Sequence, residues 1–287
     1  YIFIGFLMFY IWPNIQSSIF KLGQLIASSG YGGTFVYGIV KRALVPFGLH
    51  HIFYTPFYQT AIGGSMEVNG VLVHGAQNIF FAQLADPNLK HFSVEATKYF
   101  SGEFMIMIFG LPGAALAMYQ CAKDEAKKVV RSLFLSAALT SILTGITEPI
   151  EFAFIFVAPM LFVVNVFLAG TAFVLAQALR VTIGFTFSCG LIDFLIFGVL
   201  QGNSKTHWIF IVIFGLIYFF IYYFSFRFLI KKFDLKTPGR EDDNKLTIFN
   251  KKKMDYSFDQ SLIDPQVQMI LKGLGGRHNF TDLDCCI

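Results

Sequence analysis

Several long stretches of this 287-residue chain contain no charged side chain. Trp208–Phe226 and Phe104–Ala122 are each nineteen residues long, and Phe152–Leu179 is longer. A helix needs about 20 apolar residues to cross the hydrocarbon core of a bilayer. Charged residues make up 14% of the chain, whereas soluble domains average roughly 25%. The stretches therefore predict an all-α polytopic membrane protein.

The sequence between and beside these stretches is less regular. Val181–Leu200 predicts another helix, with Asp193 in its interior, and Phe152–Leu179 is long enough for a tilted helix plus part of a hairpin, with Pro159 and Gly170 as breaks. Ile62–Lys98 is a polar insertion that we expect to pack as a loop over the membrane part. Within it, Val68-Asn69-Gly70-Val71 predicts a β-hairpin, because Asn-Gly suits a type I′ turn.

The run Gly145–Glu151 places two carboxylates inside very apolar sequence, since the thirteen residues before it are uncharged. An ionised side chain at bilayer depth costs at least about 2.5–3.5 kcal/mol, so such residues usually have a function. Pro149 also breaks a helix there, and broken backbone survives in a membrane only where it is buried in protein or lines a wet cavity. Glu148 and Glu151 therefore predict a polar site. Glu151 is the weaker expectation, because it can instead brace the broken helix.

A second candidate group is Lys41-Arg42, followed by His50-His51. Arg42 and one histidine near carboxylates suit a hydroxyl-rich ligand, whose groups both donate and accept hydrogen bonds. A single histidine in apolar sequence is also often only a packed core residue. Adjacent histidines point in different directions from a helix, and no zinc-ligand spacing is present, so we expect no metal site.

Charged residues gather in Lys123–Arg131 and Lys231–Lys253, as in cytoplasmic flanks of membrane helices. The net charge of +4 is small and indicates no nucleic-acid partner. Asp264-Pro265 predicts the start of a short amphipathic helix in a second, soluble domain. Cys121 and Cys189 are expected to be packing residues, and Cys285-Cys286 alone are a weak indication of catalysis. Both ends look cut, so we expect a fragment.

Several runs together resemble the glucose-superfamily IIC permeases of the bacterial phosphoenolpyruvate-dependent sugar phosphotransferase system (PTS), and the resemblance covers essentially the whole chain in order. The matching runs are Gly145–Pro159, Pro46–His51 with Phe53–Phe57, Phe109–Tyr119 and Gly190–Phe194. Asp284-Cys285-Cys286-Ile287 looks like the first four positions of the IIB pattern D-x-C-x-T-R-L-R. The rest of that pattern is absent, so the fragment itself is expected to lack phosphorylation activity.

The resemblance implies a fold and a domain order. It implies a IIC permease domain with re-entrant hairpins over residues 1–230, a cytoplasmic linker over 231–262, and the start of a small α/β IIB domain over 263–287. It also implies a homodimer in the bacterial cytoplasmic membrane, with the IIB part in the cytoplasm.

The resemblance also implies sugar uptake coupled to phosphorylation, with a phosphorylated IIA protein or domain as the donor and no cofactor. Arg42, His50 and Glu148 would contact the sugar, Glu151 less surely, and Cys286 would carry the phosphoryl group. The runs around His50 and Cys286 look more like the maltose/α-glucoside branch than the glucose branch, so the resemblance implies maltose or another α-glucoside as the sugar, with glucose as the alternative. Two other functions stay open: an ion- or proton-coupled carrier that uses Glu148, Glu151 and Asp193 as a relay, and a truncated permease that only binds or senses sugar.

Overall fold

The computed structural model describes residues 2–240 of the chain. This part is mostly helical, as the uncharged stretches predict. The predictions for the remainder of the linker, for the IIB domain and for Cys286 lie outside the described residues.

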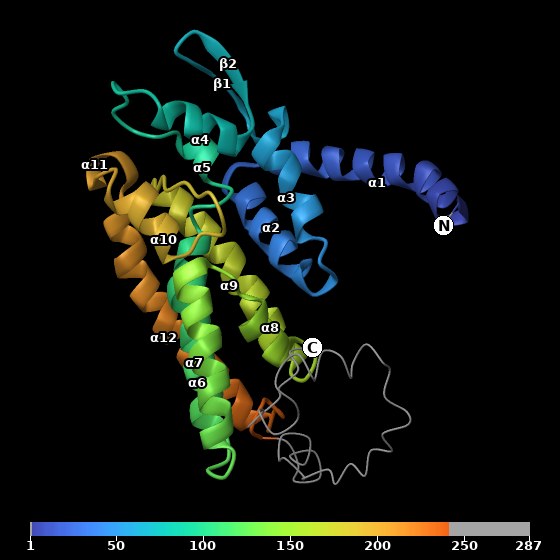
Figure 1. Ribbon diagram of the computed structural model, residues 1–287, viewed down its shortest axis with the longest axis vertical. Helices are drawn as coiled ribbons and strands as arrows, with labels where there is room; N and C mark the ends of the chain where they lie inside the picture. Colours follow the sequence, from blue (N-terminus) through green and yellow to red (C-terminus); the bar gives the residue numbers. More distant parts are fainter. Residues whose placement is uncertain (1, 241–287) are drawn as a thin grey trace, which may run out of the picture. The chain divides into compact units, whose positions relative to one another are not determined.

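The helices alternate with short irregular connections and one hairpin (Figure 1). The α-helices are α1 (Ile2–Ser28), α2 (Gly30–Ala43), α3 (His50–Gln59), α4 (Ala76–Leu84), α5 (Val94–Thr97), α6 (Leu111–Cys121), α7 (Lys127–Thr144), α8 (Glu148–Ile155), α9 (Pro159–Ala178), α10 (Leu191–Asp193), α11 (Asn203–Thr206) and α12 (Trp208–Lys232). Two 3₁₀ turns (Val45–Phe47 and Ala61–Gly63), two π-helical stretches (Met105–Gly110 and Phe194–Val199) and the strands β1 (Ser65–Val68) and β2 (Val71–His74) complete the described part.

Among the described residues, α9 and α12 are long and apolar enough to cross a membrane. The predicted span Trp208–Phe226 falls within α12, and the predicted span Phe104–Ala122 is a π-helical stretch continued by α6. Large apolar side chains such as Phe220 and Phe224 remain more than half exposed on α12. That surface suits lipid, which is as apolar as the side chains themselves.

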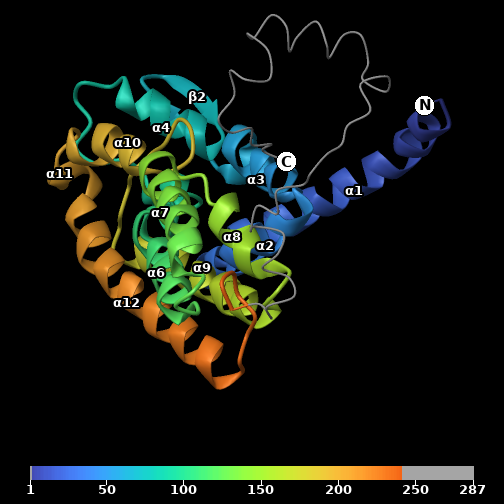
Figure 2. The same ribbon diagram turned by 60° about the horizontal axis from the view of Figure 1, so that its bottom comes forward.

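Glycines let these helices approach closely. A Cβ on Gly113 of α6 would lie 2.4 Å from the carbonyl oxygen of Phe219 on α12. A Cβ on Gly38 of α2 would lie 3.0 Å from the Cα of Gly170 on α9. Small residues at helix crossings allow close backbone packing where hydrophobic burial gives little driving force. Figure 2 shows α12 running beside α6, with α2 and α9 on the other side of α6.

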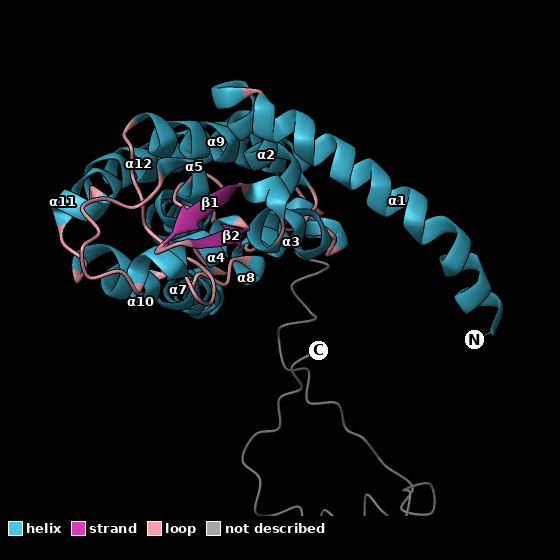
Figure 3. Cartoon of the chain, turned by 90° about the horizontal axis from the view of Figure 1, so that it is seen from above, coloured by secondary structure: helices cyan, strands magenta, loops and turns pink. Residues whose placement is uncertain are grey.

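The polar insertion contains the predicted hairpin. Strands β1 and β2 pair antiparallel, with Val68 opposite Val71, and they are the magenta arrows in Figure 3. Asn69 and Gly70 have φ values of 52° and 80°, the positive values that a type I′ turn requires. The hairpin prediction is confirmed.

One predicted break and one predicted helix need correction. Pro159 does break the Phe152–Leu179 stretch, because it begins α9, but Gly170 lies inside α9 and packs against α2. The predicted helix Val181–Leu200 is wrong in its first half, since residues 181–190 form no helix or strand. The Asp193 carboxylate binds backbone N–H groups of this segment, and so substitutes for the hydrogen bonds a helix would form.

The described part of the second basic cluster, up to Arg240, meets the first basic cluster at one end of the bundle. After α12 the chain turns back, and the backbone N–H of Lys123 donates to the carbonyl oxygen of Gly239 at 2.9 Å. The Arg240 guanidinium donates to the carbonyl oxygen of Cys121 at 2.8 Å and to Asp234 at 2.6 Å. We call residues 233–240 the C-terminal strap. The first residues of the predicted linker are therefore bound to the turn between α6 and α7.

Candidate functional site

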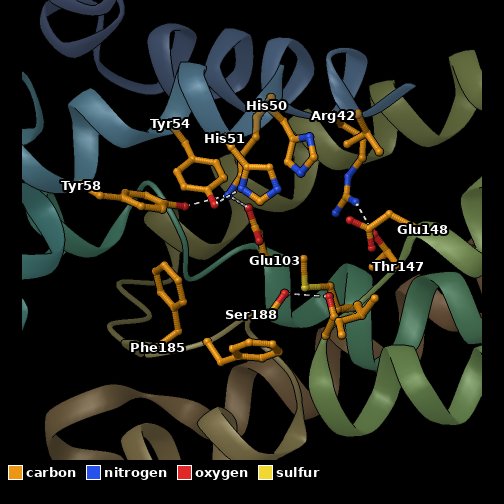
Figure 4. Close-up of a pocket in the computed structure, with 16 residues that line it drawn as sticks. Arg42, His50, His51, Tyr54, Tyr58, Glu103, Thr147, Glu148, Phe185 and Ser188 are labelled. Carbon is orange, nitrogen blue, oxygen red and sulfur yellow. Dashed lines mark hydrogen bonds and ion pairs between the residues drawn. The ribbon is translucent and has the colours of Figure 1, made fainter. Parts of the chain in front are cut away.

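A polar cavity of about 210 Å³ lies where α2, α3 and the start of α8 converge with the segment after α9 (Figure 4). The side chains around it include cations, carboxylates, imidazoles, hydroxyls and aromatic rings. They belong to Lys41, Arg42, Val45, His50, His51, Tyr54, Tyr58, Glu103, Met107, Gly145, Ile146, Thr147, Glu148, Phe185, Phe187 and Ser188. Such a cavity can offer hydrogen-bond donors and acceptors to a small polar ligand at the same time.

Arg42 lies at one wall and is held by a buried network. Its Nη1 donates to the Thr147 hydroxyl at 3.2 Å and to Glu151 Oε1 at 3.1 Å. Glu151 also accepts hydrogen bonds from Thr147 and from Asn165 Nδ2 (2.8 Å), and the Tyr222 hydroxyl in turn donates to Asn165. A buried ion pair of this kind needs extra hydrogen bonds to offset the desolvation of its charges. Both oxygens of Glu151 are thus bonded to protein groups.

The two carboxylates of the Gly145–Glu151 run have different surroundings. Glu151 is fully buried and is not among the residues that line the cavity. Glu148 is half-buried, lines the cavity, and forms no hydrogen bond within residues 2–240. Pro149 explains the difference, because it begins α8 here and leaves Glu148 at the edge while Glu151 turns inward.

Gly145 fixes how this segment meets the opposite wall. Its φ is +78°, in the left-handed region, and a Cβ there would lie 1.6 Å from the carbonyl oxygen of Ser188. The Ser188 hydroxyl donates to the carbonyl oxygen of Gly145 at 2.9 Å. Only glycine allows both the turn and this close approach.

A second buried ion pair flanks Arg42. Lys41 Nζ donates to Glu103 and, at 2.7 Å, to the Tyr58 hydroxyl, and it lies 4.7 Å from the centre of the Tyr54 ring. Lys41 and Glu103 are 9% and 4% exposed. Glu103 lies two residues before the first π-helical stretch, 62 positions along the chain from Lys41. This pair was not predicted, because each residue alone resembles an ordinary charged flank.

The two histidines lie together at the start of α3. Their ring centres are 4.1 Å apart, and both line the cavity. We expected them to point in different directions, but both side chains reach the cavity from the first turn of α3. His51 Nδ1 lies 2.6 Å from the Tyr54 hydroxyl, whereas His50 Nδ1 is buried without a hydrogen-bond partner in the described part of the chain.

Neither a metal site nor a carboxylate relay fits these positions. Residues 2–240 contain no group of three or more His, Cys, Asp or Glu side chains that could hold a metal. Asp193 does not line the cavity, and its oxygens accept from the backbone of Thr186, Phe187 and Ser188 at 3.1–3.2 Å. Its carboxylate is thereby held as an acceptor and organises a loop.

The structure brings three of the expected site residues, Arg42, His50 and Glu148, to one cavity, and it places Glu151 just behind Arg42. Cys286 lies outside the described residues. Thr147 and His51 were part of the quoted runs but were not singled out as contacts. Cys121 and Cys189 are buried, as expected of packing residues.

Comparison with known proteins gives a consistent result. Residues 1–170 match the family described as "Phosphotransferase system, EIIC". The chain is 45% identical over 286 residues to the "PTS system glucose-specific EIICBA component" of Staphylococcus carnosus (strain TM300), covering 99% of this chain and 40% of that protein. It is 46% identical to the protein of the same name from Staphylococcus saprophyticus subsp. saprophyticus, covering 99% and 39%. The chain thus spans about two fifths of the length of these relatives.

These relatives correct one expectation. Both carry the word glucose-specific in their names, so the expected maltose/α-glucoside branch has no support.

Proposed function

This chain belongs to the EIIC family of the phosphotransferase system, and from that premise we propose that it takes up glucose across a membrane and hands it on for phosphorylation. The family is one of integral membrane permeases, and α9 and α12 supply helices of spanning length. Sugar transport by a PTS permease is the function that the cavity supports best, and the relatives' names favour glucose as the sugar.

The observation that carries the proposal is that one cavity contains two kinds of polar group. Some are bonded to other protein groups, and some have no hydrogen-bond partner and can bind a ligand. Arg42 and Lys41 are fixed by buried carboxylates, while Glu148 and one nitrogen of His50 have no hydrogen-bond partner within residues 2–240. A sugar hydroxyl can accept from an imidazole or guanidinium N–H and donate to a carboxylate. We propose that Glu148, His50 and Arg42 contact the sugar and that Glu151 acts behind them by holding Arg42.

The first test is glucose binding by purified full-length protein in detergent. Glu148→Gln and His50→Ala should each raise the Kd at least about tenfold, a loss of 1.4 kcal/mol, because a buried hydrogen-bonding group of the ligand is left unpaired. Glu67→Gln is the control for the change of charge, since Glu67 is exposed on β1 and lies outside the cavity. An unchanged Kd in both cavity variants would move the sugar site elsewhere.

The proposed phosphoryl relay depends on Cys286. A cysteine thiolate forms a covalent phospho-intermediate and divides one difficult transfer into two easier ones. We propose that a phosphorylated IIA protein or domain supplies the group and that the sugar 6-hydroxyl accepts it. In the full-length protein, Cys286→Ser should abolish sugar-phosphate formation while glucose still binds, and Cys285→Ser should retain substantial activity. Activity in the first variant and loss in the second would shift the motif by one residue.

The remaining proposals follow from the family. We propose a homodimer in the bacterial cytoplasmic membrane, re-entrant hairpins in the IIC domain (residues 1–230), a cytoplasmic linker (231–262) and the start of a IIB domain (263–287). Pro149 at the start of α8 and the non-helical segment 181–190 support the hairpins, because both are breaks beside a polar cavity. The ion-coupled relay is not favoured, since Asp193 and Glu151 are both bonded to neighbouring groups.

A further inference from the structure

Phe187 is an exposed aromatic side chain that packing within the described residues does not explain. It is 70% exposed, lines the cavity, and stacks on no aromatic ring within residues 2–240. Its neighbours on either side are Thr186, which is exposed, and Ser188, which lines the cavity. Phe185, two residues earlier, is buried against Tyr58 and Phe100 with ring centres 5.3 Å and 5.2 Å away. Phe185 therefore anchors the segment, and Phe187 does not.

The backbone at Phe187 is held unusually firmly for a segment outside regular structure. Asp193 is 4% exposed, and its Oδ2 accepts from the N–H groups of Phe187 (3.1 Å) and Ser188 (3.2 Å). Its Oδ1 accepts from the N–H (3.2 Å) and the hydroxyl (2.8 Å) of Thr186. Hydrogen bonds to an ionised acceptor are about twice as strong as neutral ones.

The other side of this segment is tied to the wall that carries Glu148. Ser188 donates to the carbonyl oxygen of Gly145, and the two backbones are in contact there. Gln77 also donates to the carbonyl oxygen of Phe185 at 3.2 Å. Residues 185–188 are thus fixed by Asp193, by Gln77 and by Gly145, and the position of Phe187 at the cavity is fixed with them.

We propose that Phe187 is a substrate-stacking residue of the sugar site and that Asp193 is the positioning residue that holds it there. A pyranose ring has hydroxyls at its edge and patches of C–H groups on its faces. The polar wall formed by Arg42, His50 and Glu148 suits the hydroxyls, and the negative face of an aromatic ring attracts the weakly positive C–H groups. A cavity with a polar wall and an aromatic wall thus binds a sugar by both kinds of surface.

This inference rests on the proposed sugar site and extends it to Phe187, which was not among the expected site residues. It also gives Asp193 a function other than a proton relay. The carboxylate acts on the ligand only through the backbone of residues 186–188.

The test is glucose binding to the full-length protein, measured by calorimetry. The variants distinguish the effect of the aromatic ring from the effect of side-chain size. Phe187→Ala and Phe187→Leu should raise the Kd about fivefold to tenfold, and Phe187→Tyr should stay within about twofold of wild type, because only the last keeps a ring. Phe224→Ala is the matched control, since Phe224 is 61% exposed on α12 away from the cavity. Its Kd should not change.

Coupling between Asp193 and Phe187 tests the positioning role. Asp193→Asn should weaken glucose binding as much as Phe187→Ala, and the double variant should be no worse than either, because the two act as one unit. If Asp193→Asn fails to fold, Thr186→Val, which removes one donor to Asp193, replaces it in the same cycle. Fully additive effects would overturn the positioning role.

The outcomes also separate this inference from the proposed function. An unchanged Kd in Phe187→Ala and Phe187→Leu, with weakened binding in Glu148→Gln, would overturn the stacking role and leave the sugar site standing. Absence of glucose binding by the wild-type protein would overturn the proposed function and this inference with it.

Discussion

Glu148 and Glu151 are three positions apart but have different surroundings. Pro149 lies between them in the first turn of α8, and Arg42 binds only Glu151. Glu151 is fully buried and bonded to Arg42, Thr147 and Asn165, whereas Glu148 faces the cavity. The first is therefore part of the protein's own framework, and the second is available to a ligand. Substitutions at the two positions should fail in different ways.

Glu151→Ala should destabilise the protein by about 3–5 kcal/mol, because the Arg42 charge is left buried without its partner. Glu148→Ala should change stability by no more than about 0.5 kcal/mol, since it breaks no hydrogen bond in the described part of the protein. Thermal unfolding in detergent, measured with and without glucose, distinguishes the two variants. A large loss of stability in Glu148→Ala would contradict this division of roles.

The sequence predicted these residues unevenly. Arg42 and His50 were assigned as sugar contacts through the family resemblance, whereas Glu148 could be found because a charge in apolar sequence is costly and therefore conspicuous. Glu103 could not, since it lies beside Phe104 at the edge of an apolar stretch and its partner Lys41 is 62 positions away. Only the folded chain shows that the two charges neutralise each other.

At the scale of secondary structure elements, glycine and proline decide where the helices break and how closely they pack. Pro149 and Pro159 begin α8 and α9, and Gly113 sets the distance between α6 and α12. The hairpin and α12 were predictable, because Asn-Gly and an unbroken apolar run are local signals. The non-helical course of residues 181–190 was not, because Asp193 and Ser101, the side chains that bind its backbone, lie outside it in the sequence.

Gly113→Ala should cost about 1–3 kcal/mol of stability, because the new methyl group must push α6 away from the Phe219 carbonyl. Gly32→Ala on α2 is the control, since a Cβ there meets no atom within 4 Å. That change should be neutral or slightly stabilising, as alanine favours a helix over glycine. The midpoints of thermal unfolding compare the two. Equal midpoints would mean that the α6–α12 crossing tolerates a wider spacing.

At the scale of the whole described molecule, residues 231–240 of the second basic cluster lie at the same end of the helical bundle as Lys123–Arg131. The C-terminal strap is hydrogen-bonded to the α6–α7 turn, so the chain segments that carry the basic residues lie next to each other. The sequence predicted a common side for both from the positive-inside rule alone, and the structure adds the contact that joins them.

Single cysteines placed at Asp124 and Lys232, in a background with the four native cysteines replaced by serine, should react with a membrane-impermeant maleimide only from the cytoplasmic side. Both positions are exposed, so access does not limit labelling. Labelling of intact cells compared with inverted vesicles provides the measurement. If the two sites react from opposite sides, the strap contact is wrong; if both react from outside, the predicted orientation is wrong.

The strap has a consequence for any domain joined to the chain after residue 240. Because Arg240 is hydrogen-bonded to the end of α6, the tether to such a domain starts from a fixed point at the basic end of the bundle. Its reach is then set by the residues after the anchor and not by the whole stretch after α12. Tethering makes each encounter intramolecular, with an effective concentration that depends on linker length. Loss of the Arg240 hydrogen bond to Cys121 would lengthen the tether and lower the effective concentration of the attached domain near the bundle. The contacts in the cavity would stay unchanged.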